Sequence, residues 1–187
     1  MTTAQFSSFF AVLCLGCLAA VVIVVATLVV GRLRPQSAAD SLIDSVRPIA
    51  LWLAWLVAAV TMAGSLYYSL GAHFTPCELC WYQRICEYPL ALILLVAAVR
   101  RDVSVRDYAV PVAAVGAAIA GYHTQLQAFP EQHSFCAAFN PCTNRYVWEF
   151  GFVSLPLMDL AALLFVITML MIARRPTDVN TDEGEIQ

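Results

Sequence analysis

The fold of this chain is organised around residues 75–99, which read TPCELCWYQRICEYPLALILLVAAV. Thr75 and Glu78 have the spacing of a capping box, and Pro76 fits the first position of a helix. These residues predict a helix that continues through the apolar run Leu90–Val99. At about 100° per residue, one side of this helix presents two thiols, a cation, a carboxyl group and a phenol. These groups belong to Cys77, Cys80, Arg84, Glu87 and Tyr88.

The composition is that of an integral membrane protein. Hydrophobic residues make up 61% of the 187 residues and charged residues only 12%, whereas soluble domains carry about 25% charged residues. All ten basic residues are arginines, and they are dispersed near the ends of apolar segments. This pattern gives no basis for nucleic-acid binding, and it predicts helices that pack within lipid.

Five apolar segments are long enough to cross a hydrocarbon core of about 30 Å. They span Phe9–Val30, Pro48–Leu70, Cys77–Val99, Tyr108–Gln125 and Glu149–Ala173. The first is not expected to be a cleaved signal peptide, because its apolar stretch is too long and no basic residue precedes it. Pro89 predicts a kink in the third span, and small residues such as Gly116 and Gly121 predict close packing of the fourth. Residues 31–47 are expected to form a loop, and the acidic tail after Pro176 is expected to be disordered.

The arginines predict how the chain is oriented. Eight of the ten lie in residues 31–47, in residues 100–107 and after residue 173. The positive-inside rule places these segments in the cytoplasm. The expected protein therefore crosses the cell membrane several times, with its N-terminus outside and its C-terminus in the cytoplasm. The two cysteine pairs described next would then face the extracytoplasmic side.

Four of the seven cysteines form two pairs flanked by polar or aromatic residues, Cys77/Cys80 and Cys136/Cys142. The positive end of the helix dipole would favour the thiolate form at the first pair. The dipeptide Asn140-Pro141 favours a turn that would bring the second pair together. Zinc binding by the four cysteines and purely structural disulfides are the alternatives, although no metal is expected. We favour a redox relay, because thiol–disulfide exchange can pass electrons from a loop pair to a helix pair.

Residues 76–84, PCELCWYQR, followed by an apolar helix, resemble the first motif of the bacterial DsbB family. The pair Cys136/Cys142 and the segment Phe150–Pro156 ahead of the last span are also similar to that family. The short spacing resembles its Gram-positive, BdbC-like members. Proteins of this family are membrane thiol oxidases that pass electrons to quinone.

The resemblance implies an all-α membrane protein whose core is a four-helix transmembrane bundle, with the first span as one additional N-terminal transmembrane helix. It implies three parts. Residues 1–47 would hold the extra helix and a cytoplasmic loop, residues 48–175 the quinone-reducing core, and residues 176–187 a disordered cytoplasmic tail. The implied cofactor is menaquinone or ubiquinone, and the implied partner is a DsbA-like thiol oxidase of the thioredoxin fold.

The resemblance also implies roles for single residues. Cys77 and Cys80 would be the quinone-facing pair, with Cys80 nearer to the quinone ring, and Arg84 would hold the quinone. Cys136 and Cys142 would exchange with the thioredoxin-fold partner. The chemistry agrees, because a guanidinium one turn from a thiolate can stabilise negative charge that develops on a ring oxygen. The alternative for Arg84 is snorkelling toward lipid headgroups.

Three polar residues in the predicted spans have more than one interpretation. Glu87 would either form an intrahelical ion pair with Arg84 or relay protons. His123 would be a packing residue or a quinone contact, and together with His73 it suggests a weaker alternative, a bis-histidine haem site. Asp159 lies near the middle of the fifth span, where a carboxylate is costly unless it is paired or protonated. It would bond a neighbouring helix, or belong to a quinone pocket or proton path.

The leading hypothesis is a membrane thiol oxidase that reoxidises its partner and reduces quinone. One rival is an enzyme that exports reductant across the membrane, which would need Cys14 and Cys17 as a cytoplasm-facing pair. Those two cysteines, like Cys86, lie in apolar helix, where thiols behave as small hydrophobic groups. The other rival is a scaffold without enzymatic activity, stabilised by two disulfides.

Overall fold

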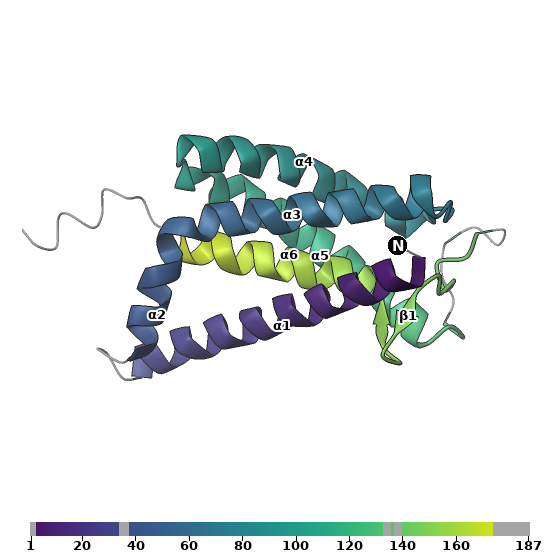
Figure 1. The fold of residues 1–187 in the computed structure, drawn as a ribbon, viewed down its shortest axis with the longest axis horizontal. Helices are drawn as coiled ribbons and strands as arrows, with labels where there is room; N and C mark the ends of the chain where they lie inside the picture. Colours follow the sequence, from purple (N-terminus) through teal and green to yellow (C-terminus); the bar gives the residue numbers. More distant parts are fainter. Residues whose placement is uncertain (1–2, 34–37, 133–135, 137–139, 174–187) are drawn as a thin grey trace, which may run out of the picture.

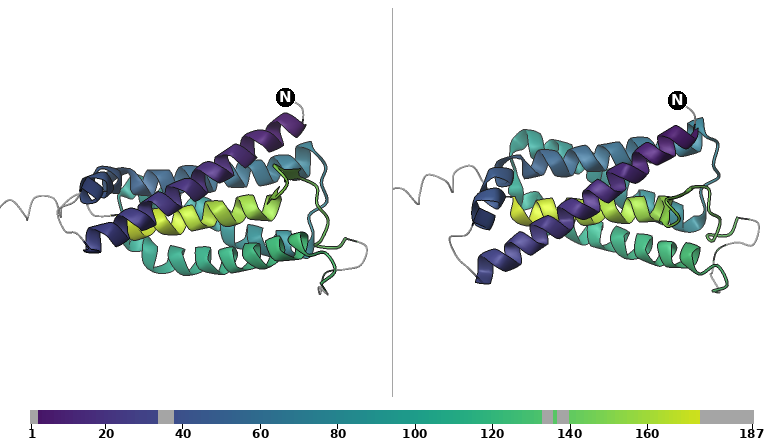
Figure 2. Two further views of the ribbon diagram at one scale, coloured as in Figure 1. Left: turned by 90° about the horizontal axis from the view of Figure 1, so that it is seen from below. Right: turned by 60° about the horizontal axis from the view of Figure 1, so that its bottom comes forward.

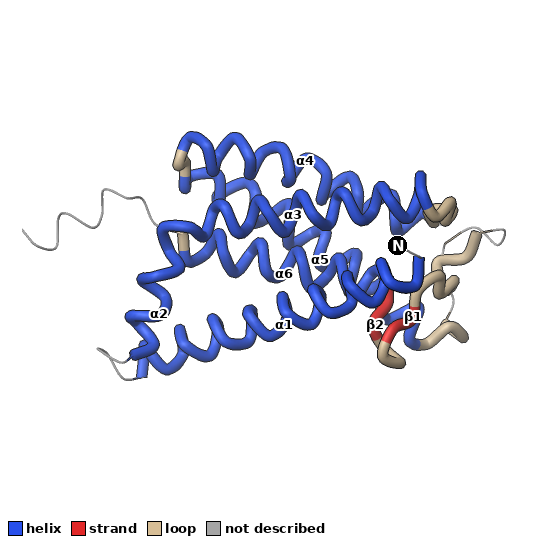
Figure 3. The backbone as a smooth tube through the Cα atoms, viewed as in Figure 1, coloured by secondary structure: helices blue, strands red, loops and turns tan. Residues whose placement is uncertain are grey.

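The computed structural model describes residues 3–33, 38–132, 136 and 140–173. Five helical stretches in it are long and apolar enough to cross a membrane. The prediction of an all-α membrane protein is therefore confirmed (Figures 1 and 3). The main elements are α1 (Thr3–Leu33), α2 (Ala38–Val46), α3 (Ala50–Leu66), α4 (Glu78–Arg100), α5 (Arg106–Ala128), β1 (Trp148–Glu149), β2 (Val153–Ser154) and α6 (Leu155–Ile172).

Helices α3, α4, α5 and α6 form a four-helix bundle. Both α3 and α5 pack against α4 and α6, so the four helices make a closed ring. Branched side chains fill its centre, and Leu90, Leu94 and Leu170 are no more than 1% exposed. Helix α1 lies outside the ring and crosses it obliquely, with its main contact to α6 (Figure 2). One helix added to a four-helix bundle is the arrangement that the family resemblance implied.

The first turns of α1 attach to the bundle through aromatic rings. The ring centroid of Phe6 lies 3.8 Å from that of Tyr67 and 4.7 Å from that of Phe10. Phe10 lies directly over Gly64 of α3, because a Cβ atom at Gly64 would be only 2.6 Å from the Phe10 ring. A glycine at this position therefore lets α1 approach α3 closely.

On one face of the fourth span, α5, the small residues allow the close packing that was predicted. Gly116 is buried between α4 and α6, where an added Cβ atom would lie 3.1 Å from Cys86 Cβ and 3.1 Å from Leu163 Cδ1. Gly121, on the same helix, has no atom within 4 Å of the corresponding position.

We expect Gly116→Leu to lower the free energy of unfolding by about 1–3 kcal/mol, because the added atoms must enter a packed interface. Gly121→Leu is the matched control on the same helix and should change this free energy little. Thermal unfolding in detergent measures both. Equal stabilities of the two variants would contradict the close packing of α5.

The prediction of a loop over residues 31–47 is wrong in its second half. Residues 38–46 form α2, and a 3-10 turn at Arg47–Ile49 joins it to α3. Ile43 is 4% exposed, so α2 is an amphipathic helix with a buried apolar residue. The prediction missed this short helix because residues 31–47, taken together, have a polar composition.

The predicted start of the last span at Glu149 is also wrong. Trp148 pairs with Ser154 and Glu149 with Val153 in a short antiparallel ladder, and α6 begins only at Leu155 (Figure 3). The chain reverses through Phe150 and Gly151, which have φ of 52° and 80°. A reversal with φ above zero interrupts any helix, so the apolar residues 150–154 belong to a hairpin.

The connections divide between the two ends of the bundle. The start of α1, the segment before α4, the loop after α5 and the β-hairpin lie at one end (Figure 1). Helix α2 and the turn between α4 and α5 lie at the other. Both candidate cysteine pairs therefore belong to the same end of the molecule.

Candidate active site

Cys77 caps α4, which corrects the predicted helix start. The capping box of Thr75 and Glu78 does not form, because the helix begins at Glu78 and Cys77 is its N-cap residue. The backbone of Cys77 is extended (φ −80°, ψ 177°), and its sulfur accepts a hydrogen bond from the amide of Cys80 at 3.4 Å. The sulfur itself therefore satisfies a free amide at the positive end of the helix.

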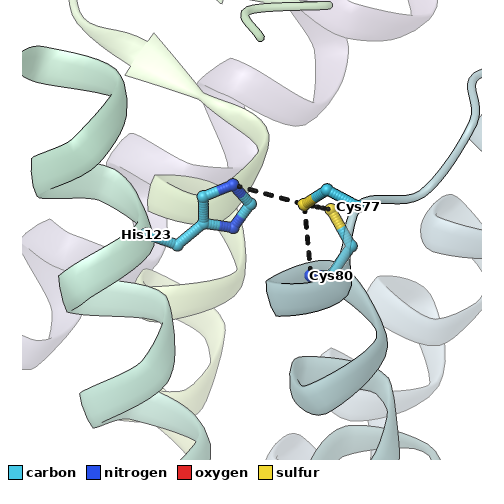
Figure 4. Close-up of side chains that lie close together, drawn as sticks. All are labelled: Cys77, Cys80 and His123. Atoms are coloured by element: carbon cyan, nitrogen blue, oxygen red, sulfur yellow. Dashed lines mark hydrogen bonds between the residues drawn. The ribbon is translucent and has the colours of Figure 1, made fainter. Parts of the chain in front are cut away.

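The sulfurs of Cys77 and Cys80 lie 2.9 Å apart, with His123 of α5 beside them (Figure 4). Nε2 of His123 is 3.7 Å from the Cys77 sulfur and 3.0 Å from the carbonyl oxygen of Cys142. A carbonyl oxygen can only accept, so Nε2 carries a hydrogen. The predicted site residue His123 thus contacts both cysteine pairs.

The charge of His123 depends on the amide of Gln83. Nδ1 of His123 lies 3.4 Å from Gln83 Oε1. If Nδ1 donates a hydrogen bond to this oxygen while Nε2 donates to Cys142, both ring nitrogens carry a hydrogen and the ring is an imidazolium. The nitrogen of the Gln83 amide is buried without a hydrogen-bond partner. Reversing that amide would let it donate to Nδ1 of a neutral ring.

The surroundings stabilise Cys77 as a thiolate. The hydrogen bond from Cys80 lowers the pKa of the Cys77 thiol the most, and the hydrogen bond and charge of His123 lower it further. Burial opposes these effects, yet the pKa falls from 9.0 to about 4. Above about pH 4, Cys77 is therefore ionised and nucleophilic, while Cys80 supplies the hydrogen that it accepts.

We expect His123→Leu to raise the pKa of Cys77, because the variant removes a hydrogen-bond donor from beside the sulfur. The pH at which iodoacetamide labels Cys77 half-maximally in the reduced protein should move up from about 4. His73→Asn is the control, because His73 is exposed and its φ of 56° is one that asparagine tolerates. A labelling profile that does not move in His123→Leu would show that His123 has no part in ionising Cys77.

The second pair is joined as a disulfide. Cys136 and Cys142 form this bond across six positions of sequence. Cys142 is 1% exposed, whereas Cys136 is half-buried. A thiol partner can therefore reach the Cys136 sulfur more readily than that of Cys142.

Three side chains hold the disulfide loop against the bundle. The Asn140 side-chain amide donates to the carbonyl oxygen of Pro76 at 3.0 Å, next to Cys77. The Gln127 amide donates to the carbonyl oxygen of Asn144 at 2.8 Å. Arg145 donates to the last carbonyl groups of α5 and stacks on Trp148, 4.0 Å from its centroid. These contacts bring all four cysteines into one apolar cluster with Leu79, Ile119 and Leu126.

A cavity of about 100 Å³ lies beside this cluster, toward the membrane interior. Cys80 lines it, whereas Cys77 does not. Its other lining residues come from α1, α3 and the turn that follows it, α4, α5 and α6, and are Phe10, Thr61, Gly64, Ser65, Tyr68, Gln83, Arg84, Glu87, His123, Leu155, Pro156, Met158 and Asp159. Cys80, Arg84 and Glu87, the site residues predicted on α4, therefore line one space, whereas Tyr88 does not.

Arg84 is held at this cavity by two serines that the sequence analysis did not identify. Its Nε donates to Ser65 Oγ at 3.1 Å, and its terminal nitrogen donates to the Ser65 carbonyl oxygen at 3.2 Å and to Ser69 Oγ. Tyr88 donates to the same Ser65 hydroxyl at 3.2 Å. The guanidinium thus points toward α3, not to lipid headgroups. The available signal was a pair of small hydroxyl residues four positions apart, with Ser65 near the end of α3 and Ser69 in the π-helical turn that follows it (Tyr67–Gly71).

Glu87 and Asp159 are the two carboxyl groups of the cavity. Glu87 is 3% and Asp159 is 8% exposed. The ion pair between Arg84 and Glu87 that was one interpretation is not formed: in the described part of the chain, the ion pairs are Arg47–Asp44 and Arg106–Asp107. Asp159 of α6 lines the same cavity as Glu87 of α4, close enough for the charges of the two carboxyl groups to interact.

The remaining cysteines and histidine lie away from this centre. Cys86 packs against Gly116 and does not line the cavity. Cys14 and Cys17 line a separate apolar cavity between α1, α3 and α6. His73 is exposed on the segment before α4, whereas His123 is buried with its Nε2 bonded to Cys142.

The donor atoms of Cys77, Cys80 and His123 lie within 4.8 Å of one another, a spacing that a metal ion can use. A structural zinc site normally has four ligands. The two other cysteines of the cluster, Cys136 and Cys142, are in a disulfide. Among the described residues, this group therefore offers three metal ligands, one fewer than a structural zinc site normally has. Its geometry fits thiol chemistry better than zinc binding.

Comparison with known proteins identifies the family. The family model for disulfide bond formation protein DsbB matches residues 47–174, which contain α3 to α6 and both cysteine pairs. The chain is 39% identical over 130 residues to disulfide bond formation protein C of Bacillus subtilis (strain 168), covering 68% of this chain and 94% of that protein. It is 39% identical over 127 residues to a probable disulfide formation protein of Coxiella burnetii (strain Dugway 5J108-111), covering 66% and 86%. No solved structure matches the chain significantly. The chain therefore belongs to the DsbB family of disulfide bond formation proteins.

Proposed function

We propose that this protein is a membrane thiol oxidase that reoxidises a thioredoxin-fold, disulfide-forming partner and passes the electrons to a membrane quinone. The observation that carries the proposal is the order of sulfurs in the cluster. A half-buried Cys136 is bonded to a buried Cys142, Cys142 is linked through His123 to Cys77, and Cys80 borders the cavity that holds Arg84. The names of the similar proteins, which describe disulfide formation, support the same direction of electron flow.

The first step is exchange with the partner. A partner thiolate attacks the Cys136 sulfur, the Cys136–Cys142 bond breaks, and a mixed disulfide forms with Cys136. The second thiol of the partner then attacks that bond and leaves as a disulfide. Cys136 and Cys142 remain as two thiols, reduced by two electrons.

The second step is exchange between the two pairs. Cys142 attacks Cys77 of the oxidised inner pair, which breaks the Cys77–Cys80 bond, and Cys136 then attacks Cys142 to restore the outer disulfide. The products are an outer disulfide and an inner dithiol. These are the oxidation states of the structure, in which Cys136–Cys142 is bonded and Cys77 and Cys80 are free.

The cavity residues fit a quinone head. A quinone bound there would supply a two-electron acceptor, with Cys80 at its edge. Arg84 would hold a carbonyl oxygen and stabilise the charge that develops on it, while Ser65 and Ser69 keep the guanidinium in place. Apolar side chains, among them Phe10, would exclude water. The inner dithiol of Cys77 and Cys80 would give up two electrons and become a disulfide again.

The arginines support an orientation for this reaction. Arg47, Arg100, Arg101 and Arg106 belong to the end of the bundle that carries α2, opposite to the cysteine pairs. The positive-inside rule assigns that end to the cytoplasm. The cysteine pairs would then face the oxidising side of the cell membrane, where disulfides persist.

Anaerobic titration of the purified protein tests the proposal. A reduced thioredoxin-fold oxidase is added with a menaquinone or ubiquinone analogue, and quinol absorbance is followed. We expect equal amounts of quinol and partner disulfide. Cysteines that stay oxidised in the presence of reduced partner would favour the scaffold, and reduction that requires Cys14 and Cys17 would favour export of reductant.

A further inference from the structure

The cavity contains two carboxyl groups for which the proposed electron transfer has no role. Glu87 of α4 and Asp159 of α6 are both more than nine-tenths buried, and both line the cavity. One oxygen of Glu87 and both oxygens of Asp159 are buried without a hydrogen-bond partner among the described residues. Unpartnered polar atoms of this kind in the wall of a cavity point to a ligand or to a proton that they hold.

The nearby cation does not neutralise them. Arg84 directs its donors to Ser65 and Ser69, and it forms no ion pair with either carboxyl group within the described part of the chain. An unpaired carboxylate in the membrane interior is very costly, and two carboxylates side by side would repel each other as well. The pair is therefore most stable when it holds a proton.

We propose that Glu87 and Asp159 act as one proton-sharing pair that delivers a proton into the cavity when the inner dithiol is oxidised. This inference rests on the proposed function, because the acceptor of the proton is the quinone that receives the electrons. Asp159 belongs to none of the motifs found in the sequence. The proposal gives it a role in the same site as Glu87.

Counting protons shows why such a donor is needed. Reduction of a quinone to a quinol takes two electrons and two protons. The inner pair supplies both electrons, but in its thiolate–thiol form only Cys80 carries a proton. When the Cys77–Cys80 bond closes, Cys80 gives up that proton, and the carboxyl pair gives the second. The negative charge moves from the Cys77 thiolate to the carboxyl pair, so the charge balances.

Other titratable groups around the pair are few. Cys80, Arg84 and Cys86 are on α4 with Glu87, His123 faces from α5, and Tyr68 faces from the π-helical turn after α3. His123 is bonded to the Cys142 carbonyl oxygen, and Tyr68 donates to Ser7. Among these groups, the two carboxyl groups alone combine burial, free oxygen atoms and a place on the cavity.

The first test uses the protein without quinone. Infrared spectra in an ester-free detergent at neutral pH should show the carbonyl stretch of a protonated carboxyl group. The double variant Glu87→Gln/Asp159→Asn should lack this band. Glu78→Gln, a matched substitution at an exposed position of the same helix, should keep it. A band that is absent from the parent protein, or that persists in the double variant, would overturn the inference.

The second test separates the inference from the proposed function. In single turnovers of the reduced protein, Glu87→Gln and Asp159→Asn should each slow quinol formation by about 100-fold. Quinone affinity, measured by fluorescence quenching, should stay as in the parent, and Glu87→Asp should recover much of the rate. If the parent protein reduces no quinone, the proposed function fails and the infrared band still decides whether the pair holds a proton. If it does and the variants are equally fast, only the inference fails.

Discussion

Cys80→Ala is expected to abolish electron transfer to quinone completely. Cys80 is the sulfur of the inner pair that lines the cavity, next to Arg84, and Cys77 without it cannot form the inner disulfide. The outer disulfide should still exchange with the partner once, because Cys136 and Cys142 are intact. The protein would then stop after one reduction of its outer pair.

Stopped-flow absorbance of quinol, with reduced partner in excess, measures this loss. The matched control is Cys86→Ala, a buried cysteine on the same helix that packs against Gly116, away from the cavity. It should keep the rate of the parent protein. Partner oxidation at the parental rate in Cys80→Ala would refute the relay and favour another route to the quinone.

Cys136→Ala is expected to stop oxidation of the partner while the inner pair stays active. Cys136 is the reachable sulfur of the outer disulfide, whereas Cys142 is buried in the cysteine cluster. A small thiol such as dithiothreitol should still reduce the inner pair directly, so quinol formation with this reductant persists. The predicted signature is therefore loss of activity with the protein partner and retention with the small thiol.

The complementary variant sharpens this result. In Cys142→Ala, the free thiol of Cys136 can attack the disulfide of the oxidised partner and form a mixed disulfide. No Cys142 thiol is present to attack that bond from the loop, so the mixed disulfide should accumulate and appear on a non-reducing gel. Cys14→Ala is the control, because Cys14 lies in α1 beside the separate apolar cavity. If the mixed disulfide accumulated in Cys136→Ala instead, Cys142 and not Cys136 would be the cysteine that bonds to the partner.

Much of the architecture could be predicted from the sequence. Apolar segments of sufficient length predicted five spans, and the structure has five such helices. Local patterns also predicted Cys77, Cys80, Arg84 and Glu87 on one side of α4, because the helical period alone decides which residues share a face. The errors were local too. Apolar residues 150–154 looked like the start of a span, but two residues with φ above zero turn them into a hairpin.

The sequence by itself determined the membrane class, the two cysteine pairs and the family, because these depend on composition and on residues close together in the chain. Only the tertiary structure decided that His123 touches both pairs, that Ser65 and Ser69 hold Arg84, and that Asp159 meets Glu87. Each of these contacts joins two segments that are separated in the sequence. Which faces of two helices meet depends on how they pack across the bundle, and no periodicity within one segment contains that information.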